Sequence, residues 1–504
     1  MSILMHNPRN TPSFLRRSNP RVLFAALFLS CVGYYAGRLS TFSTEGTSEY
    51  EVRRIWSTRT LPELERVTVT VDGPQVTVLG PQVTFQAPQA TVTVTTEVFV
   101  PKADIPEDAP IVLNGPPTEA LQDNLRDDVQ YITSFPGTGF TNDVMAFMNL
   151  LYLAILTQRV PIMPFFTPTH VTTAARKTVP PIDFGVIFDI PRLSKELGMP
   201  VLEWWQVKDR SSKTIDPLGC WSIWKAVSTR NKDAHPSSAP NTLHLDISWT
   251  TPPTWIKLLK DLPEEPHARF TSLMALTFPD LRGKSLRPST PSPRLKLSLP
   301  PDERLVCFDN MYWIANVEPH ELTHDYSTTW RFVGKNLHWN PRIEGLARDY
   351  IRQTFSLPDS EPIPPYITIH VRHNDFASWC KLPVDECFAP LSAFARRVEE
   401  VKDELRTTKG ISVERVIVTS DEKNSTFWDE VASFDWYRVD HHKTVDTYGG
   451  WYPILIDAAI QSGGMGLVGT DLSTVSMIAA HRVKAWQGGA SRMVKWGRPG
   501  ADDH

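Results

Sequence analysis

The stretch Pro364–Cys380 carries the side chains with the clearest potential for chemistry. In "PPYITIHVRHNDFASWC" an apolar, β-branched run ends in His370 and Arg372, and Asp375 follows three residues later. A short, nearly continuous apolar run is typical of a strand covered on both faces, as in a parallel sheet. Ligands of open α/β sheets bind just beyond the carboxyl ends of such strands. We therefore expect these three polar residues to belong to a binding site.

Three segments of the sequence have residue types that favour an anion. Arg372 offers a planar fork of donors suited to phosphate oxygens. Ser473 and Thr474 open a helix after the strand "GLVGTD", and Gly137 and Gly139 form a turn in "PGTGFTND" whose N–H groups can approach a ligand closely. Each has a structural alternative: an ion pair with the nearby aspartate, a simple N-cap, or a turn with positive φ. Together the three segments indicate that the site binds a diphosphate group.

Metal and covalent chemistry have less support in the sequence. No two Asp residues are separated by one position, so the Asp-x-Asp motif of metal-dependent sugar-nucleotide transferases is absent. Asp440, His441 and His442 could ligate a metal, but adjacent side chains usually point in different directions, which favours a loop. The sequence has no Gly-x-Ser-x-Gly elbow and no Cys-His pairing for acyl chemistry. We expect no metal site and no cofactor.

The elements that must position these residues alternate between strand and helix. We expect a strand at 129–134, a Gly-rich turn at 135–141, a helix at 142–157 and a strand from 160, which is a half-Rossmann unit. From Pro364 onward, strand and helix alternate again. This order predicts an α/β protein with two doubly wound parallel sheets and a cleft between them. For the Trp-rich region 170–300 we expect short helices and loops, followed by a strand at 304–308.

We divide the chain into five segments. They are a cytosolic tail (1–21), a transmembrane signal anchor (22–37), a low-complexity stem rich in Pro and Thr (38–125), an N-terminal Rossmann-like domain with Trp-rich insertions (126–340) and a C-terminal Rossmann-like donor-binding domain (341–504).

The anchor is predicted from residues 22–37, which carry no charge between Arg21 and Arg38. Sixteen residues suit the thinner membranes of the early secretory pathway. Because arginines precede the segment and glutamates follow it, the positive-inside rule places the N-terminus in the cytosol and the body in the lumen. A cleaved signal peptide is the alternative. We expect a single-pass type II protein of the Golgi or endoplasmic reticulum membrane.

The stem contains a seven-residue repeat in which Gly73, Gly80 and Ala87 are each followed by Pro-Gln. Pro in every repeat excludes a coiled coil despite the heptad period. Regular Pro and abundant Thr favour an extended stalk that could be O-glycosylated. The Val-Thr alternation leaves a small β-solenoid or a hairpin as alternatives.

Cysteine usage agrees with a lumenal location. Cys31 lies in the anchor, Cys380 and Cys387 are the local candidates for a disulfide, and Cys220 and Cys307 are then left over. Four free thiols are the alternative, which a reducing compartment would impose. Asn424-Ser425-Thr426 is the one acceptable N-glycosylation sequon. The net charge of −4 and the pI near 6.4 give no reason to expect a nucleic-acid partner.

Three motifs resemble those of the GDP-fucose protein O-fucosyltransferases. "HVRHNDF" resembles that family's His-x-Arg…Asp-aromatic motif, "PGTGFTND" its N-terminal Gly-rich motif, and "DAAIQSGGMGLVGTDLSTVSMIAAHR" its C-terminal motif. They come in the family's order and cover residues from about 128 to 490. The resemblance implies a GT-B fold and inverting, metal-independent transfer of fucose from GDP-fucose to a protein or glycan hydroxyl.

The resemblance also implies roles for individual residues. Arg372 would hold the β-phosphate and stabilise the leaving GDP. The remaining donor-binding residues would be Gly137, Gly139, Asn142, His370, Asp375, Ser473 and Thr474. Asp457 and Arg482 would be structural or support the site.

The sequence departs from the family pattern at positions that bear on catalysis. Asp143 replaces the usual Gln after Asn142, and Val475 stands where an aromatic residue is expected. Asp143 is our candidate for the base that deprotonates the acceptor, with a helix cap as its alternative. Two other functions stay open: the same fold with another nucleotide sugar, and a catalytically inactive lumenal sugar-binding protein.

Overall fold

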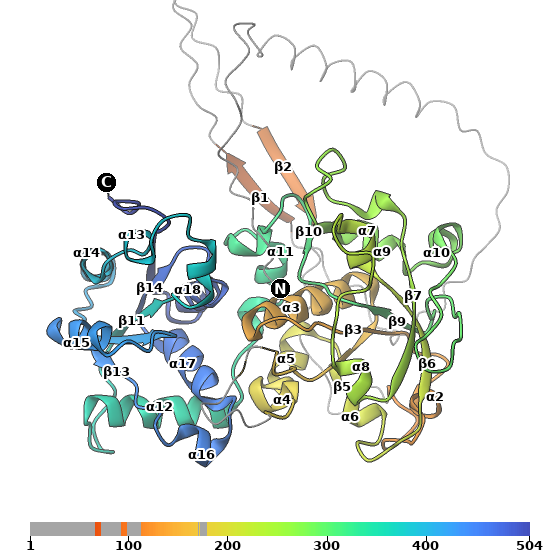
Figure 1. Cartoon of the computed structure of the whole chain (residues 1–504), viewed down its shortest axis with the longest axis horizontal. Helices are drawn as coiled ribbons and strands as arrows, with labels where there is room; N and C mark the ends of the chain where they lie inside the picture. The colour runs from red at the N-terminus through yellow and green to blue at the C-terminus, as the bar shows by residue number, and fades with distance from the viewer. Residues whose placement is uncertain (1–65, 72–91, 98–111, 170, 172–178, 504) are drawn as a thin grey trace, which may run out of the picture. The chain divides into compact units, whose positions relative to one another are not determined.

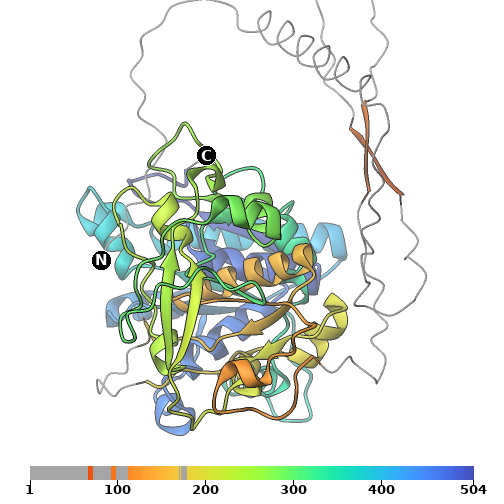
Figure 2. The ribbon, with the colours of Figure 1, turned by 90° about the vertical axis from the view of Figure 1, so that its right-hand side faces the viewer.

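The computed structural model describes residues 66–71, 92–97, 112–169, 171 and 179–503. The predicted anchor and most of the predicted stem lie outside these ranges. The described body contains two large parallel sheets, each accompanied by helices, and is therefore an α/β structure (Figures 1 and 2).

The strands are β1 (Arg66–Val71), β2 (Val92–Glu97), β3 (Tyr131–Ser134), β4 (Val160–Met163), β5 (Leu202–Glu203), β6 (Asp216–Trp221), β7 (Leu245–Thr250), β8 (Ala268–Arg269), β9 (Leu305–Phe308), β10 (Ile314–Ala315), β11 (Tyr366–Val371), β12 (Arg415–Ser420), β13 (Tyr437–Arg438), β14 (Gly466–Thr470) and β15 (Ala490–Val494).

The α-helices are α2 (Leu121–Asn124), α3 (Phe140–Thr157), α4 (Phe184–Ile187), α5 (Ile190–Leu197), α6 (Trp204–Val207), α7 (Ile223–Val227), α8 (Ala239–Thr242), α9 (Phe270–Ala275), α10 (Pro279–Ser285), α11 (Thr328–Phe332), α12 (Pro341–Phe355), α13 (Val384–Cys387), α14 (Leu391–Lys409), α15 (Ser425–Ser433), α16 (Thr444–Tyr448), α17 (Tyr452–Gly463) and α18 (Thr474–Gln487). The 3-10 helices are η1 (Thr254–Ile256), η2 (Glu321–Thr323), η3 (Gly334–Asn336) and η4 (Asp375–Trp379).

The sheet of the N-terminal half has the order β5-β4-β3-β9-β6-β7, with every pair parallel. Ile132 of β3 packs in the same core as α3, whereas Tyr131 belongs to the core on the other face. That second core includes the disulfide Cys220–Cys307, which joins the neighbouring strands β6 and β9. β3 and its neighbours are therefore covered on both faces, as parallel strands require.

The sheet of the C-terminal half has the order β13-β12-β11-β14-β15, again all parallel. All six residues of β11 are buried, which confirms the strand predicted there. Ile367 and Ile369 share a core with α14, while Tyr366 lies in the core that contains α17. Because the chain adds strands to one side of β11 and then returns to the other, its topological switch point lies between β11 and β14, where α/β proteins bind ligands.

Helix α3 confirms the helix predicted near residue 142 and begins two residues earlier, at Phe140. Its 18 residues are long and apolar enough for a membrane span, but 78% of them are buried inside the protein. Its composition therefore reflects a core helix between the sheet and the rest of the body.

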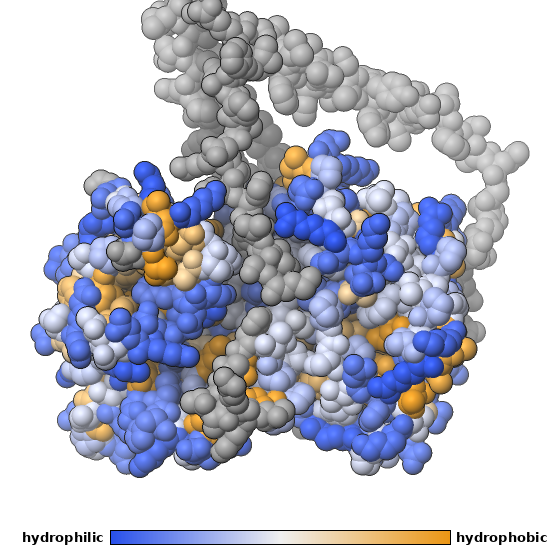
Figure 3. All heavy atoms as spheres, viewed as in Figure 1, coloured by the Kyte–Doolittle hydropathy of each residue, from blue (hydrophilic) through white to orange (hydrophobic). Residues whose placement is uncertain are grey.

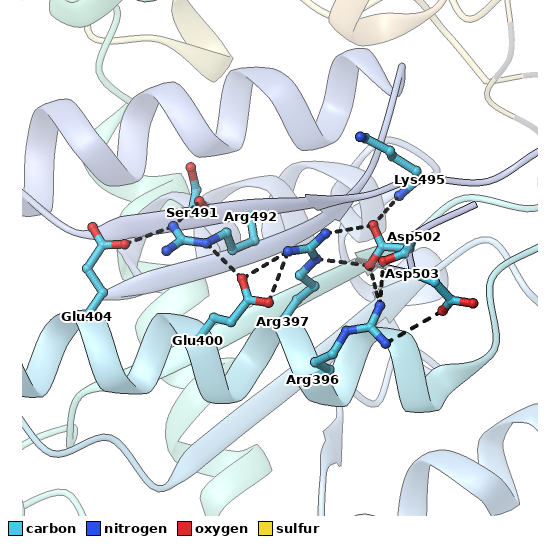
Figure 4. Close-up of polar contacts among 9 residues, drawn as sticks. All are labelled: Arg396, Arg397, Glu400, Glu404, Ser491, Arg492, Lys495, Asp502 and Asp503. Carbon is cyan, nitrogen blue, oxygen red and sulfur yellow. Dashed lines mark hydrogen bonds and ion pairs between the residues drawn. The ribbon is translucent and has the colours of Figure 1, made fainter. Parts of the chain in front are cut away.

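A cluster of ion pairs fastens the last residues of the chain to α14 (Figure 4). Asp502 is 4% exposed and accepts hydrogen bonds from the side chains of Arg396 and Arg397 and from the main chain of Lys495. Burial alone would raise the pKa of Asp502, but the hydrogen bond from Arg397 and the other donors outweigh it and lower the pKa. Asp502 is therefore ionised at neutral pH and holds the C-terminal segment in place.

Two expectations and one structural alternative need correction. The predicted stem extends too far, because Val112, Leu121 and Leu125 pack in the core of the N-terminal half. Within the Trp-rich region the structure has two six-residue strands, β6 and β7, where we expected helices and loops. The glycines of the "PGTGF" turn do not have positive φ, as shown below. In the stem, β1 and β2 pair antiparallel, which is the hairpin alternative for that segment.

On the face of the protein seen in Figure 3, hydrophobic side chains form small patches within a largely hydrophilic surface.

Candidate functional site

Arg372 follows β11 at the carboxyl edge of the C-terminal sheet. Its Nε and Nη2 contact Oδ1 of Asp375 at 2.9 Å, and its Nη1 lies 3.0 Å from Oδ2 of Asp421, the residue that follows β12. The ion pair with Asp375 that we considered as a structural alternative is therefore present. Of these three contacts, the one from Nε to Asp375 is a hydrogen bond and the two from the terminal nitrogens are ion pairs, and each terminal nitrogen of a guanidinium carries two N–H groups. Because the side chain is 32% exposed, the remaining N–H groups can bind a ligand.

The amino end of α18 lies beside Arg372. The main-chain N–H of Arg372 donates to Oγ1 of Thr470, the last residue of β14, at 3.0 Å. Ser473 is the N-cap of α18, and Thr474 is its first residue. The free N–H groups and the dipole at the start of a helix favour an anion. The structure thus brings Arg372, Ser473 and Thr474 to adjacent strand ends at the switch point of the sheet.

His370 does not face the open edge. It is 6% exposed, and its Nδ1 lies 2.8 Å from Oγ of Ser476 in the first turn of α18. Burial, together with the nearby charge of Arg372, lowers the pKa of His370 to about 3, so its imidazole is neutral. The structure therefore gives His370 a role in fixing α18 against β11, and a direct contact with a donor stays a prediction.

The buried imidazole of His370 predicts a loss of stability in acid. Its pKa rises from about 3 in the folded protein to its ordinary value of 6.5 on unfolding, so the unfolded chain binds more protons between these values. We expect unfolding to become about 2 kcal/mol easier from this group alone between pH 7 and pH 5. Urea unfolding of wild type and His370→Asn at both pH values measures the difference. If His370→Asn lost as much stability between pH 7 and pH 5 as wild type does, the loss could not be assigned to His370.

A cavity of about 610 Å³ opens beside this edge, at the carboxyl ends of β12 and β13. Its lining includes Ser420 at the end of β12, the loop residues Asp440, His441 and His442, and Asp457 of α17. Asp457 Oδ1 lies 2.8 Å from Nε2 of His441, and no described residue hydrogen-bonds to its Oδ2. The cavity therefore offers a carboxylate to a bound molecule next to the anion-favouring edge. Among the described residues, no group of three His, Cys, Asp or Glu side chains is arranged to hold a metal ion.

The Gly-rich turn lies at the carboxyl edge of the N-terminal sheet, after β3. Gly137 is required by close approach, because a Cβ there would lie 2.5 Å from the carbonyl oxygen of Pro236. Gly139 is the N-cap of α3 with a φ of −78°, so a positive φ explains neither glycine. Asn142 stands in the first turn of α3 and is partly exposed.

Asp143 is 1% exposed, and its Oδ1 accepts hydrogen bonds from the main-chain N–H and the hydroxyl of Thr138 at 2.9 and 2.6 Å. These contacts tie the Gly-rich turn to the first turns of α3, but the N-cap of α3 is Gly139 and has no side-chain cap hydrogen bond, so Asp143 is not a helix cap. Burial raises the pKa of Asp143 to about 7, although the bonds from Thr138 oppose this shift. Its role as the base stays a prediction, and the geometry shows a carboxylate held by the turn that precedes the helix.

The carboxyl edges of the two sheets approach each other at the amino ends of α3 and α18. A small cavity is lined by Thr141 in the first turn of α3, by Val475 in the first turn of α18, and by Gln461 and Arg482. Since α3 follows the Gly-rich turn and α18 follows β14, the Gly137 turn and the Arg372 edge lie on two sides of one junction.

Arg482 of α18 lines the small cavity at this junction. It is 3% exposed, its guanidinium carbon stands 4.2 Å from the ring centre of Trp339, and its Nε and Nη2 have no hydrogen-bond partner among the described residues. Burial lowers the pKa of Arg482 to about 9, so it remains charged at neutral pH. Its aromatic contacts agree with the structural role that we expected.

The sequon residue Asn424 is exposed and is the N-cap of α15. Its side-chain oxygen accepts from the N–H of Thr426 at 3.0 Å, and no described residue hydrogen-bonds to its amide nitrogen, the atom that a glycan would join. Both disulfides that we expected are present, Cys220–Cys307 and Cys380–Cys387.

Sequence reasoning missed Asp421 and the cavity that contains Asp457. Asp421 follows the predicted strand "RVIVTS", and its place at a strand end was a usable signal. It pairs with Arg372 because β11 and β12 are neighbours in register, with Val371 opposite Ser420.

Several solved structures have a fold similar to that of this chain. POFUT1 in its apo form gives a TM-score of 0.46 at 16% identity, over 74% of this chain and 99% of that chain. POFUT1 in complex with GDP-fucose gives 0.47 at 15% identity over the same shares. The fucosyltransferase NodZ from Bradyrhizobium gives 0.37 at 14% identity, over 70% of this chain and 92% of that chain. The similarity is one of fold.

No protein-family model matches the sequence, and no curated protein matches it either. At these identities and TM-scores the similarity of fold assigns no activity, so the function is argued from the site alone.

Proposed function

We propose that this protein is an inverting glycosyltransferase that moves fucose from GDP-fucose to a hydroxyl of a protein or glycan acceptor. The observation that carries the proposal is the position of Arg372. It stands at the switch point of a parallel sheet with spare N–H groups, beside the amino end of α18 and next to a cavity that contains a carboxylate. This arrangement suits an elongated ligand with a base at one end and a diphosphate in the middle.

In the proposed reaction the acceptor oxygen attacks C1 of the sugar from the side opposite the diphosphate. The bond from C1 to the phosphate oxygen breaks, and negative charge develops on the leaving GDP. Arg372 and the first-turn N–H groups of α18 stabilise this charge, as fixed donors do at other sites of charge development.

Asp457 favours guanine as the base in the cavity. A carboxylate only accepts hydrogen bonds, and guanine presents N–H donors at its base-pairing edge. We expect Asp457→Asn to weaken GDP binding about 10- to 100-fold, since one or two charge-assisted hydrogen bonds are lost. Titration calorimetry with GDP measures the change. Asp446→Asn, at an exposed position on α16, is the matched control and should bind as wild type. An unchanged affinity in Asp457→Asn would remove guanine from this cavity.

Two alternatives use the same residues differently. Another GDP- or UDP-sugar could occupy the site, and an inactive lumenal sugar-binding protein would have no use for a diphosphate site. Asp457 counts in favour of a guanine nucleotide, and Arg372 counts against a protein that binds sugar alone.

Thermal unfolding of the full chain with GDP, GDP-fucose, GDP-mannose and UDP-sugars tests the proposal. A ligand that binds only the folded state raises the melting temperature. Stabilisation by GDP and GDP-fucose above the other nucleotides would support the fucosyl donor. No stabilisation by any nucleotide would overturn the proposal.

We further propose that the catalytic body lies in the lumen of the Golgi or endoplasmic reticulum, anchored by residues 22–37. The two disulfides support an oxidising compartment.

A further inference from the structure

His235 lies above the carboxyl ends of the three central strands of the N-terminal sheet. Its main-chain N–H donates to Oδ2 of Asp309, the residue after β9, at 3.1 Å. Its ring packs edge-on against Trp224, in the segment after β6, with ring centres 5.5 Å apart. The residues that follow it rest on the turn after β3: the carbonyl of Pro236 lies against Gly137.

This position is firmly held. Asp309 is fully buried and also accepts from the hydroxyl of Ser222 at 2.7 Å and from the N–H of Ile223 at 2.8 Å. On the other side, the hydroxyl of Ser237 donates to the carbonyl oxygen of Pro136 at 2.8 Å. The backbone of His235 is thus fixed to the ends of three strands, although it belongs to a loop.

The hydrogen bonds of the ring define its tautomer. Nδ1 lies 3.1 Å from the carbonyl oxygen of Pro236, which can only accept, so Nδ1 carries the hydrogen. Nε2 of the neutral ring then carries a lone pair, and no described residue hydrogen-bonds to it. Burial lowers the pKa of His235 below its ordinary value, and the neighbouring carboxylate of Asp309 partly opposes this shift. Asp309 is the charged group that faces the imidazole among the described residues, and it favours protonation of the ring. Burial outweighs it, so the ring is neutral at pH 7.

We infer that Nε2 of His235 accepts the proton of the acceptor hydroxyl in the transfer reaction, an inference that rests on the proposed function. The Gly137 turn leads directly into α3, whose first turn meets the first turn of α18 at the junction of the two edges. His235 is therefore on the side of the junction opposite Arg372, as a base must be when attack comes from the side opposite the leaving diphosphate.

The step is balanced. The proton of the acceptor O–H passes to Nε2, the oxygen lone pair forms the bond to C1, and the electrons of the broken C1–O bond remain on the β-phosphate of GDP. The imidazolium then releases its proton to solvent. Asp143, the candidate for this role from the sequence, is held instead by Thr138.

Hydrolysis of GDP-fucose by the full chain tests the inference, because water can replace the unidentified acceptor. His235→Asn keeps a side-chain amide that can still donate to Pro236 but removes the lone pair of Nε2. His244→Asn is the matched control, at the opposite edge of the sheet just before β7. Its φ of 54° is one that Asn tolerates well.

We expect His235→Asn to hydrolyse GDP-fucose about 100- to 10,000-fold more slowly than wild type. We also expect it to lose the fall in rate that protonation of His235 causes in wild type at acid pH. Its melting temperature should still rise with GDP as in wild type, and added imidazole should restore part of the rate. Equal hydrolysis and pH profiles in His235→Asn and wild type would overturn the inference alone. A wild type that binds GDP without hydrolysing GDP-fucose would also overturn it, whereas a wild type that does not bind GDP would overturn the proposed function as well.

Discussion

Replacing Arg372 by alanine is expected to remove most of the affinity for GDP and to lower the rate of transfer at least about 100-fold. The guanidinium follows β11 and lies between the cavity that contains Asp457 and the amino end of α18. Hydrogen bonds to charged groups contribute about 1.5–3 kcal/mol each, and one fixed donor to a developing charge accounts for about 10²- to 10³-fold in rate. The loss should therefore appear in both GDP binding and turnover.

Arg372→Lys separates charge from geometry. Lysine keeps the positive charge but not the planar fork, so it cannot contact Asp375 and Asp421 while also presenting two N–H groups to a phosphate. We expect this variant to bind GDP more tightly than the alanine variant and still to transfer fucose much more slowly than wild type. A lysine variant with wild-type turnover would mean that only the charge matters.

The control for Arg372→Ala is Arg406→Ala. Arg406 pairs with Asp403 on the exposed side of α14, with 69% of its side chain exposed, so its removal changes the net charge by the same amount away from the site. Because Arg372→Ala also leaves Asp421 without its ion-pair partner, the rise in melting temperature with GDP is measured against each variant's own ligand-free value. Equal rises in Arg372→Ala and Arg406→Ala would exclude Arg372 from the nucleotide site.

The strand–helix alternation of the C-terminal half was predictable because its signals are local. β11 is an unbroken apolar run, and α14 ends at Gly410, which has the positive φ of a helix C-cap. A strand end identifies where a ligand can bind before the fold is known. For that reason Arg372 and Ser473 could be predicted to follow strand ends, and the structure brings both to the carboxyl edge of the C-terminal sheet.

The strands of the Trp-rich region could not be predicted from the sequence because their residue types are explained by contacts with distant parts of the chain. Gly219 in β6 is needed because any Cβ at this position would collide with the main-chain carbonyl of Pro300, and Pro217 lies where β6 has only β7 as a partner. In β7, buried Asp246 accepts a hydrogen bond from the hydroxyl of Ser292 at 2.6 Å. Pro, Gly and Asp argue against strands in a local pattern, and only the tertiary contacts explain them.

The pairing of Arg372 with Asp421 and the position of His235 could not be predicted for the same reason. Asp421 lies far along the chain from Arg372, and their contact depends on the register of β11 against β12. His235 has no motif around it, since its site is formed by residues after β3, β6 and β9. The sequence thus indicated the Arg372 side of the proposed site, where a strand carries the signal, whereas the position of His235 depends on tertiary contacts.

The disulfide Cys220–Cys307 is expected to contribute more to stability than Cys380–Cys387, although each is a single covalent bond. The first closes a loop of 87 residues between two core strands, and the second closes a loop of 7. When a disulfide acts by restricting the unfolded chain, the longer loop corresponds to about 4–5 kcal/mol and the shorter one to about 2 kcal/mol. Both Cys220 and Cys307 are fully buried, so alanine at these positions also leaves small cavities.

We therefore expect Cys220→Ala/Cys307→Ala to lower the free energy of unfolding at least about 2 kcal/mol more than Cys380→Ala/Cys387→Ala does. Urea unfolding of the two double variants, followed by tryptophan fluorescence, measures the difference. Dithiothreitol reduces the bond that remains in each variant and should shrink the difference to the contribution of the cavities. The shorter loop begins shortly after Asp375, so its variant should instead alter GDP binding more than stability. Equal losses of stability would mean that native-state packing, and not the constraint on the unfolded chain, determines what each bond contributes.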